Sequence, residues 1–214
     1  MSDMEPVNIM GVVASPNPDK EKQVIRFIDS SYNSLFTVPN GGSIILTRFD
    51  GSKTTAICTY IDDYHAKIGS NVYHICQFAE IMEQNGATYA PAHPQQGDIC
   101  DTYEIYQIKD VGGVDYCFSS YDEAKGRMKP TDYRRAYAGV LSPKVAMGDL
   151  FMKHNRDNRP FGRDMRSLSV SDVLVINRSG VKRAYYVDSF GFKEVKRFLP
   201  RARTTPKKER GEAR

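Results

Sequence analysis

Short apolar runs bounded by turn residues follow one another along the chain after residue 22. Four runs rich in β-branched and aromatic residues stand at 23–28, 34–38, 43–48 and 53–60. Such runs favour strands, and the asparagine, aspartate and glycine residues at 40–42 and 50–51 accept the positive φ that tight hairpin turns need. The pattern therefore predicts an antiparallel meander that includes a hairpin over 43–60. Residues 9–13 are apolar enough to dock as a further strand.

The spacing of apolar positions then changes to three and four residues, which predicts an amphipathic helix. The positions that share this spacing are Val72, Ile75, Cys76, Ala79 and Met82, with Phe78 and Ile81 beside them. Ser70 or Asn71 would cap its first turn, and Gly86 stands where a helix ends in the left-handed conformation. We expect this helix to lie across the hairpins and to complete a first domain.

A second domain is predicted to repeat this organisation after a polar, proline-rich stretch. Its expected elements are a hairpin of strands 103–109 and 115–120, a short helix opened by Ser120 and Glu123, an edge strand over 132–141, a helix from Ser142-Pro143 to His154, and a hairpin of 172–176 with 181–187. The Ser120–Glu123 spacing is that of a capping box, and proline is favoured at the first position of a helix.

The expected fold class is therefore α+β, with two small domains that each pack a mainly antiparallel sheet with one or two helices. We assign residues 1–22 to a flexible lead-in, 23–92 to the first domain, 93–100 to a linker, 101–199 to the second domain and 200–214 to a disordered basic tail.

The charge of the chain is concentrated in that tail. Its basic residues are Arg201, Arg203, Lys207, Lys208, Arg210 and Arg214. Against two glutamates they leave a net charge of +4, which equals the formal charge of all 214 residues. A neutral body with a basic end is typical of a protein that contacts an anionic partner.

A second basic segment lies between the helix ending at His154 and the last hairpin. It carries Arg156, Arg159, Arg163 and Arg166, and we expect Arg183, Lys193, Lys196 and Arg197 to join the same face. Guanidinium groups pair bidentately with phosphate oxygens, so this surface is a candidate grip for nucleic acid or another anionic partner. The alternative is that the arginines pair with local carboxylates and solubilise a loop.

Residue chemistry offers no clear catalytic or metal centre. His74 and Cys76 would point in different directions on a helix, and no phosphate-binding glycine loop or serine-nucleophile elbow is present. Asp62, Asp63 and His65 could form a nuclease centre or a solvated turn. We read the bend at Ser189 as one that places Phe190 and Phe192 in the core. No enzymatic activity, metal or cofactor is therefore expected.

The cysteines and the missing targeting signals indicate a cytoplasmic protein. Cys58, Cys76, Cys100 and Cys117 lack metal-ligand spacing, and we expect them to be small buried side chains. No leader and no membrane-spanning apolar stretch is seen in the sequence.

The letters RSLSVSDV at 166–173 and AYYVDSFGF at 184–192 closely resemble the end of YodL-like domains. The segments at 133–141 and 148–155 resemble the same family, so the likeness covers about residues 101–199. Residues 27–51 and 68–91 resemble a small domain associated with large polyvalent proteins of phages and conjugative elements. No catalytic set comes with either resemblance.

The resemblance implies a setting in phages, plasmids and conjugative transposons of Gram-positive bacteria, where such domains accompany DNA-handling and host-countering modules. We therefore expect a non-enzymatic accessory protein that binds a host or element-encoded protein, including a ribonucleoprotein, and that counters a defence system such as a CRISPR effector. The alternative is a DNA- or RNA-binding protein that uses the basic loop and tail. A steep loss of affinity with salt would distinguish phosphate contact from an apolar protein interface.

Overall fold

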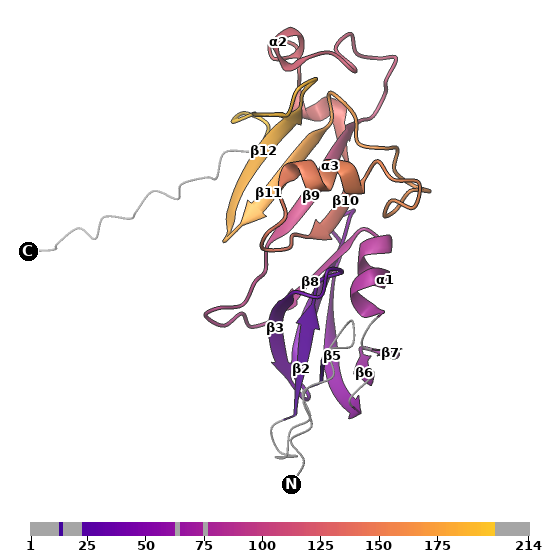
Figure 1. Ribbon diagram of the computed structural model, residues 1–214, viewed down its shortest axis with the longest axis vertical. Coiled ribbons are helices and arrows are strands. Elements are labelled where there is room, and N and C mark those ends of the chain that lie inside the picture. Colours follow the sequence, from indigo (N-terminus) through magenta and orange to yellow (C-terminus); the bar gives the residue numbers. More distant parts are fainter. Residues whose placement is uncertain (1–12, 15–22, 63–64, 75–76, 200–214) are drawn as a thin grey trace, which may run out of the picture.

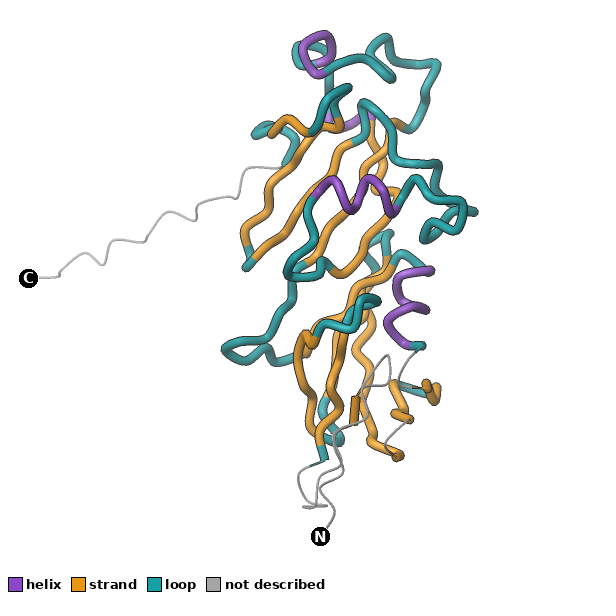
Figure 2. The backbone as a smooth tube through the Cα atoms, viewed as in Figure 1, coloured by secondary structure: helices purple, strands orange, loops and turns teal. Residues whose placement is uncertain are grey.

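The computed structural model describes residues 13–14, 23–62, 65–74 and 77–199 (Figure 1). Two domains lie one after the other along the longest axis, and both consist mainly of antiparallel strands with few helices (Figures 1 and 2). This confirms the predicted α+β class. The predicted tail at 200–214 and most of the predicted lead-in lie outside the described residues.

The first domain contains two sheets. Strands β1 (Val13–Ala14), β2 (Val24–Ile28) and β3 (Ser34–Pro39) form a small antiparallel sheet in that order. The second sheet has the order β7-β6-β5-β4-β8. Its strands are β4 (Ser43–Arg48), β5 (Lys53–Asp62), β6 (His65–Ile68), β7 (Asn71–His74) and β8 (Ala87–Pro91).

The predicted hairpin over 43–60 is confirmed as β4 and β5, with Gly51 at a φ of 91° in the turn. The continuous meander is wrong, because β3 and β4 belong to different sheets. Strand β4 gives one edge to β5 and the other to β8, so neither edge is left for β3.

The predicted helix of the first domain is shorter than its apolar period. Helix α1 is Phe78–Gln84, and Gly86 follows it at a φ of 59°, as expected for a left-handed helix end. The predicted first turn is instead strand β7, which pairs with β6 across a turn at Gly69. Cross-strand pairing therefore overrides the helical period there, and Val72 is exposed. Ile75 and Cys76 lie outside the described residues.

The core of the first domain lies between its two sheets and α1. Phe27 stacks on Phe36 with ring centroids 4.9 Å apart, and Phe78 of α1 meets the edge of Tyr89 at 5.1 Å. The inward positions of the five-stranded sheet add small side chains such as Ala56 and Cys58. This aromatic core fixes α1 against both sheets.

The second domain is built on one five-stranded antiparallel sheet in the order β10-β9-β11-β12-β13. The strands are β9 (Thr102–Ile108), β10 (Tyr133–Val140), β11 (Val173–Arg178), β12 (Val181–Val187) and β13 (Phe192–Glu194). The hairpin of β11 and β12 and the edge position of β10 are both as predicted.

Both faces of this sheet are covered. Leu174 packs into one hydrophobic cluster with α3 (Met147–Lys153), whereas its neighbours Val173 and Val175 pack into another. Successive side chains of a strand point to opposite faces, so the two clusters lie on the two sides of the sheet. The second cluster contains Phe198 and residues beside α2 (Tyr121–Ala124).

Three predictions for the second domain are wrong. Residues 115–120 form turns and no strand, because β10 and β11 already occupy the two edges of β9. Helix α3 begins at Met147, since residues 143–146 turn before it. Phe190 is 93% exposed, although Phe192 does pack against the core. The Ser120–Glu123 capping box of α2 is confirmed.

The two domains contact each other directly. Phe49, in the turn between β4 and β5, packs on Phe161 with ring centroids 4.9 Å apart. The Tyr137 hydroxyl donates to the Glu83 carbonyl at 3.1 Å. A Cβ at Gly86 would lie 3.4 Å from a ring carbon of Tyr137, 3.6 Å from one of Phe161 and 3.5 Å from the Cβ of Phe49, so the backbone passes close to all three side chains. Residues 92–101 connect the domains and contain no helix or strand.

Candidate functional site

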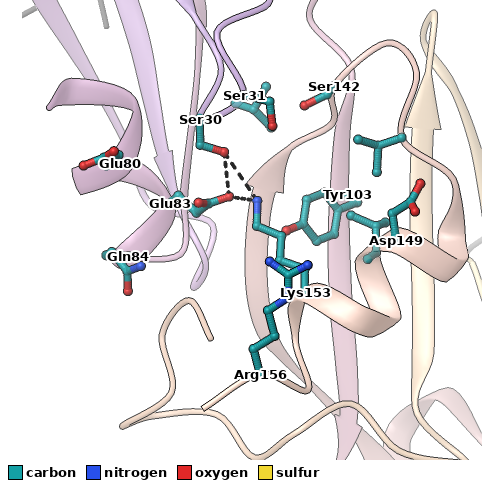
Figure 3. Close-up of a pocket in the computed structure, with 13 residues that line it drawn as sticks. Ser30, Ser31, Glu80, Glu83, Gln84, Tyr103, Ser142, Asp149, Lys153 and Arg156 are labelled. Carbon is teal, nitrogen blue, oxygen red and sulfur yellow. Dashed lines mark hydrogen bonds and ion pairs between the residues drawn. The ribbon is translucent and has the colours of Figure 1, made fainter. Parts of the chain in front are cut away.

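A cavity of about 430 Å³ opens at the junction of the two domains (Figure 3). Helix α1 contributes Glu80, Glu83 and Gln84, and α3 contributes Lys153 from the facing domain. Arg156, in the segment that follows α3, also lines the cavity (Figure 3). The cavity therefore brings carboxylates of the first domain to basic side chains of the second.

Lys153 forms the centre of this junction. Its ammonium group pairs with Glu83 and lies 3.4 Å from the Ser30 oxygen, while the Ser30 hydroxyl donates to Glu83 at 3.0 Å. Burial lowers the pKa of Lys153 to about 8, and the nearby Asp29 carboxylate opposes that shift. Because Ser30 donates to a carboxylate, Lys153 is not arranged as its general base. These contacts join the first domain, through Ser30 and Glu83, to Lys153 of the second domain.

The predicted basic loop divides between two hollows. Arg156 lines the junction cavity, whereas Arg159 and Arg163 line a neighbouring hollow of about 760 Å³ together with Asp157 and Asp164. Gln84 of α1 borders both hollows. The structure therefore brings these three arginines near one another but places aspartates among them.

Arg166 forms an ion pair with a buried carboxylate of its own domain. Its guanidinium forms a two-pronged ion pair with the fully buried Asp172, which also accepts hydrogen bonds from Gln107 at 3.0 Å and from the Ser169 amide at 2.9 Å. Burial raises the pKa of Asp172 to about 6, while Arg166 holds it down. Arg166 therefore neutralises a buried carboxylate and is not available as a free anion grip.

The remaining predicted basic residues do not share one face. Arg183 is exposed on β12 in register with Ile176, on the side of the sheet that carries α3. Lys196 and Arg197 stand between Val195 and Phe198, which pack into the cluster on the opposite side. The tail positions Arg201, Arg203, Lys207, Lys208 and Arg210 lie outside the described residues.

Polar residues of the two sequence motifs mostly hold loops in place. The Ser171 hydroxyl accepts a hydrogen bond from the Phe118 amide at 3.0 Å. Asp188 accepts from the Tyr121 amide at 2.9 Å, and Gly191 turns the chain at a φ of 78°. The motifs thus fasten the segment around α2 to the bend after β12.

Residues 102–198 match the family model of the YodL-like domain. No curated protein matches the chain. No solved structure matches it either. The YodL-like domain thus accounts for the whole five-stranded sheet and both of its hydrophobic clusters. Its motif residues Arg166, Asp172 and Asp188 have partners within the domain.

The YodL-like domain presents two aromatic side chains that sequence reasoning missed. Phe118 is 56% exposed at a φ of 62°, and its ring lies 5.7 Å from the Arg166 guanidinium. Phe190 is exposed at the bend that Asp188 ties to α2. We call this pair, Phe118 and Phe190, the aromatic end.

The junction side of the YodL-like domain also contains a buried histidine. His154 is fully buried, its Nε2 lies 2.9 Å from the Tyr103 hydroxyl, and its ring packs on Tyr137. Burial, together with Lys153 and Arg159, lowers the pKa of His154 to about 3. This histidine is therefore neutral and part of the core.

The predicted Asp62–His65 pair is present in the first domain. His65 Nδ1 lies 2.9 Å from Asp62 Oδ1, and the His74 ring stands perpendicular to that of His65. Asp63 lies outside the described residues, so the nuclease hypothesis stays a prediction. Within the described ranges, no three or more of His, Cys, Asp and Glu are grouped to hold a metal ion.

Two further sequence predictions concern cysteines and membranes. Cys58 is buried as predicted, whereas Cys100 and Cys117 are only half-buried. Among the helices of the described residues, none has the length and apolar character that crossing a membrane requires.

Proposed function

We propose that this protein is a non-enzymatic interaction module of a bacterial mobile genetic element, and that it binds a host or element-encoded protein. A CRISPR effector or another defence component is the class of partner that we favour. The observation that supports this proposal is the exposure of Phe118 and of Phe190 on the YodL-like domain. The match of residues 102–198 to that family is consistent with the setting.

Exposed aromatic rings on a rigid support are typical of binding hot spots. Phe190 keeps nearly its whole ring in water, and Phe118 holds a left-handed backbone conformation that costs a bulky residue free energy. Hydrogen bonds from the Phe118 and Tyr121 amides fix both segments. A partner that covers the rings would recover their hydrophobic free energy at little cost in ordering.

Affinity purification from a nuclease-treated lysate of a Gram-positive host tests the proposal. The wild-type chain should retain one protein, and the double variant Phe118→Asn/Phe190→Ser should lose it. Asparagine tolerates positive φ, so the variant should fold normally. The matched control is Ile57→Ser/Val72→Ser, which removes two comparably exposed apolar side chains from the first domain.

Retention of the same protein by both double variants would contradict the aromatic end as the binding surface. Loss of all retained protein after nuclease treatment would favour the second candidate function, direct binding of DNA or RNA. The exposure of Lys196 and Arg197 is the observation that favours this second candidate.

A further inference from the structure

A separate hollow of about 600 Å³ lies beside α2, between the turn that follows this helix and the segment after β13. Its lining residues are Tyr121, Lys125, Gly126, Met128, Pro130, Glu194, Val195, Lys196, Arg197 and Phe198. We call this hollow the α2 groove. It contains none of the arginines of the 156–166 loop.

One wall of the α2 groove is a short turn at residues 195–198. Val195 and Phe198 are three residues apart and buried, and the Phe198 amide donates to the Val195 carbonyl at 3.2 Å. The Phe198 ring packs on Tyr106 and Tyr133 at 5.3 and 5.2 Å. Because these two residues anchor the turn, the intervening Lys196 and Arg197 are held at the surface.

The opposite wall comes from α2 and the turn after it. Tyr121 is half-buried against Tyr186, and Lys125 makes an exposed ion pair with Asp122 at 2.9 Å. Three basic side chains therefore line the groove against the single carboxylate of Glu194. The sequence directly after the groove adds six basic and two acidic residues, so positive charge increases toward the end of the chain.

We propose that the α2 groove binds the phosphate backbone of single-stranded nucleic acid. The volume of the hollow lies in the range of small-molecule sites, so it suits a short stretch of unpaired nucleotides. Basic side chains next to an aromatic ring, here Lys196, Arg197 and Tyr121, are the combination that binds single strands without sequence preference. This inference concerns a different surface from the aromatic end, and it deepens the second candidate function, direct nucleic-acid binding, on which it rests.

The test measures binding of a fluorescently labelled oligothymidylate by the full chain, using anisotropy over a range of salt concentrations. The first variant is Lys196→Ala/Arg197→Ala, and its matched control is Arg156→Ala/Arg163→Ala, which removes the same charge from the other side of the sheet. If each lost cation contacts one phosphate, the log–log salt slope should become shallower by about 1.4 in the first variant only.

A second pair of variants adds a negative charge without disturbing the fold. A side chain at Gly126 would meet nothing within 4 Å, and the same holds for Gly148 in α3. Gly126→Glu should weaken oligonucleotide binding at least tenfold at low salt, while Gly148→Glu should leave it unchanged. A chain that ends at Pro200 should bind more weakly but keep its sensitivity to Gly126→Glu.

Four results would overturn the inference. The first two are no binding at low salt and equal weakening by the groove variants and their controls. The third is complete dependence on residues 201–214 with no effect of Lys196→Ala/Arg197→Ala. The fourth is tighter binding of an acidic peptide than of oligothymidylate at the same salt concentration.

Discussion

The Arg166 guanidinium pairs through both of its terminal nitrogens with the buried carboxylate of Asp172, in a loop for which the sequence left open anion binding or pairing with local carboxylates. Gln107 of β9 and the Ser169 amide complete the shell of donors around this carboxylate. The pair therefore ties the loop before β11 to the centre of the sheet. Its role in the YodL-like domain is structural.

Asp172→Ala should destabilise the protein by about 3 kcal/mol, because it leaves the Arg166 guanidinium without its carboxylate partner and the Ser169 amide without that acceptor. The Gln107 amide keeps only its longer hydrogen bonds to the carbonyls of Arg166 and Ser167, at 3.3 and 3.4 Å. Urea unfolding followed by circular dichroism would measure the change in the free energy of unfolding. The matched control, Asp164→Ala, removes an exposed carboxylate from the same loop and should change stability by less than about 0.5 kcal/mol. Equal effects of the two substitutions would contradict the structural role of the pair.

Gly139→Ala should destabilise the YodL-like domain through overpacking. A Cβ at Gly139 would lie 2.7 Å from a ring carbon of Tyr137 and 2.8 Å from one of Tyr103, so two buried rings must shift. We expect a loss of about 1–3 kcal/mol in thermal or urea unfolding. Gly126→Ala meets open space and serves as the control. An unchanged free energy of unfolding for Gly139→Ala would show that the rings of Tyr103 and Tyr137 can move aside.

His154 should make the protein less stable at acidic pH. The unfolded histidine takes up a proton below about 6.5, whereas the buried one stays neutral until about 3, so protons favour the unfolded state between these values. Stability should fall as pH decreases through this window, by up to about 1.4 kcal/mol per pH unit from this group.

The variant His154→Gln isolates that contribution, because other titrating groups such as Asp172 are shared with the wild type. The difference in unfolding free energy between the two proteins should change steadily from pH 6.5 to pH 4. Parallel stability curves over this range would contradict a buried neutral histidine.

Phe161→Ala should loosen the contact between the domains. The substitution removes the ring that packs on Phe49 and covers Gly86, and so weakens the junction without touching the core of the first domain. Limited proteolysis should then cut faster within residues 92–98, with both fragments still folded by circular dichroism. Phe118→Asn, which removes an exposed ring distant from the junction, should leave the cleavage rate unchanged.

Local sequence signals predicted most elements of this fold. The β4–β5 and β11–β12 hairpins follow from alternating apolar residues and glycine-containing turns, whose requirements are met within a few residues. The Ser120–Glu123 capping box is local in the same way. Errors arose where strand pairing competes with local pattern, as in β7, where a helical period is overridden by pairing with β6.

The candidate surfaces were predictable only in part. Sequence identified the basic residues, but not that Asp172 neutralises Arg166 or that the sheet separates Arg156 from Lys196. The exposed ring of Phe190 contradicted the expectation that apolar residues near a strand end are buried. Whether a side chain is exposed depends on which residues pack against it in the fold, and those residues are distant in the sequence.

The sequence by itself determined the strand-rich α+β class and the YodL-like likeness of the second half, because alternation, turns and motifs are short-range properties of the chain. Tertiary structure alone decided that β3 and β4 enter different sheets, that Glu83 meets Lys153 across the junction, and that the α2 groove forms. Each of these depends on which strand edges and faces remain unoccupied after the rest of the chain has packed.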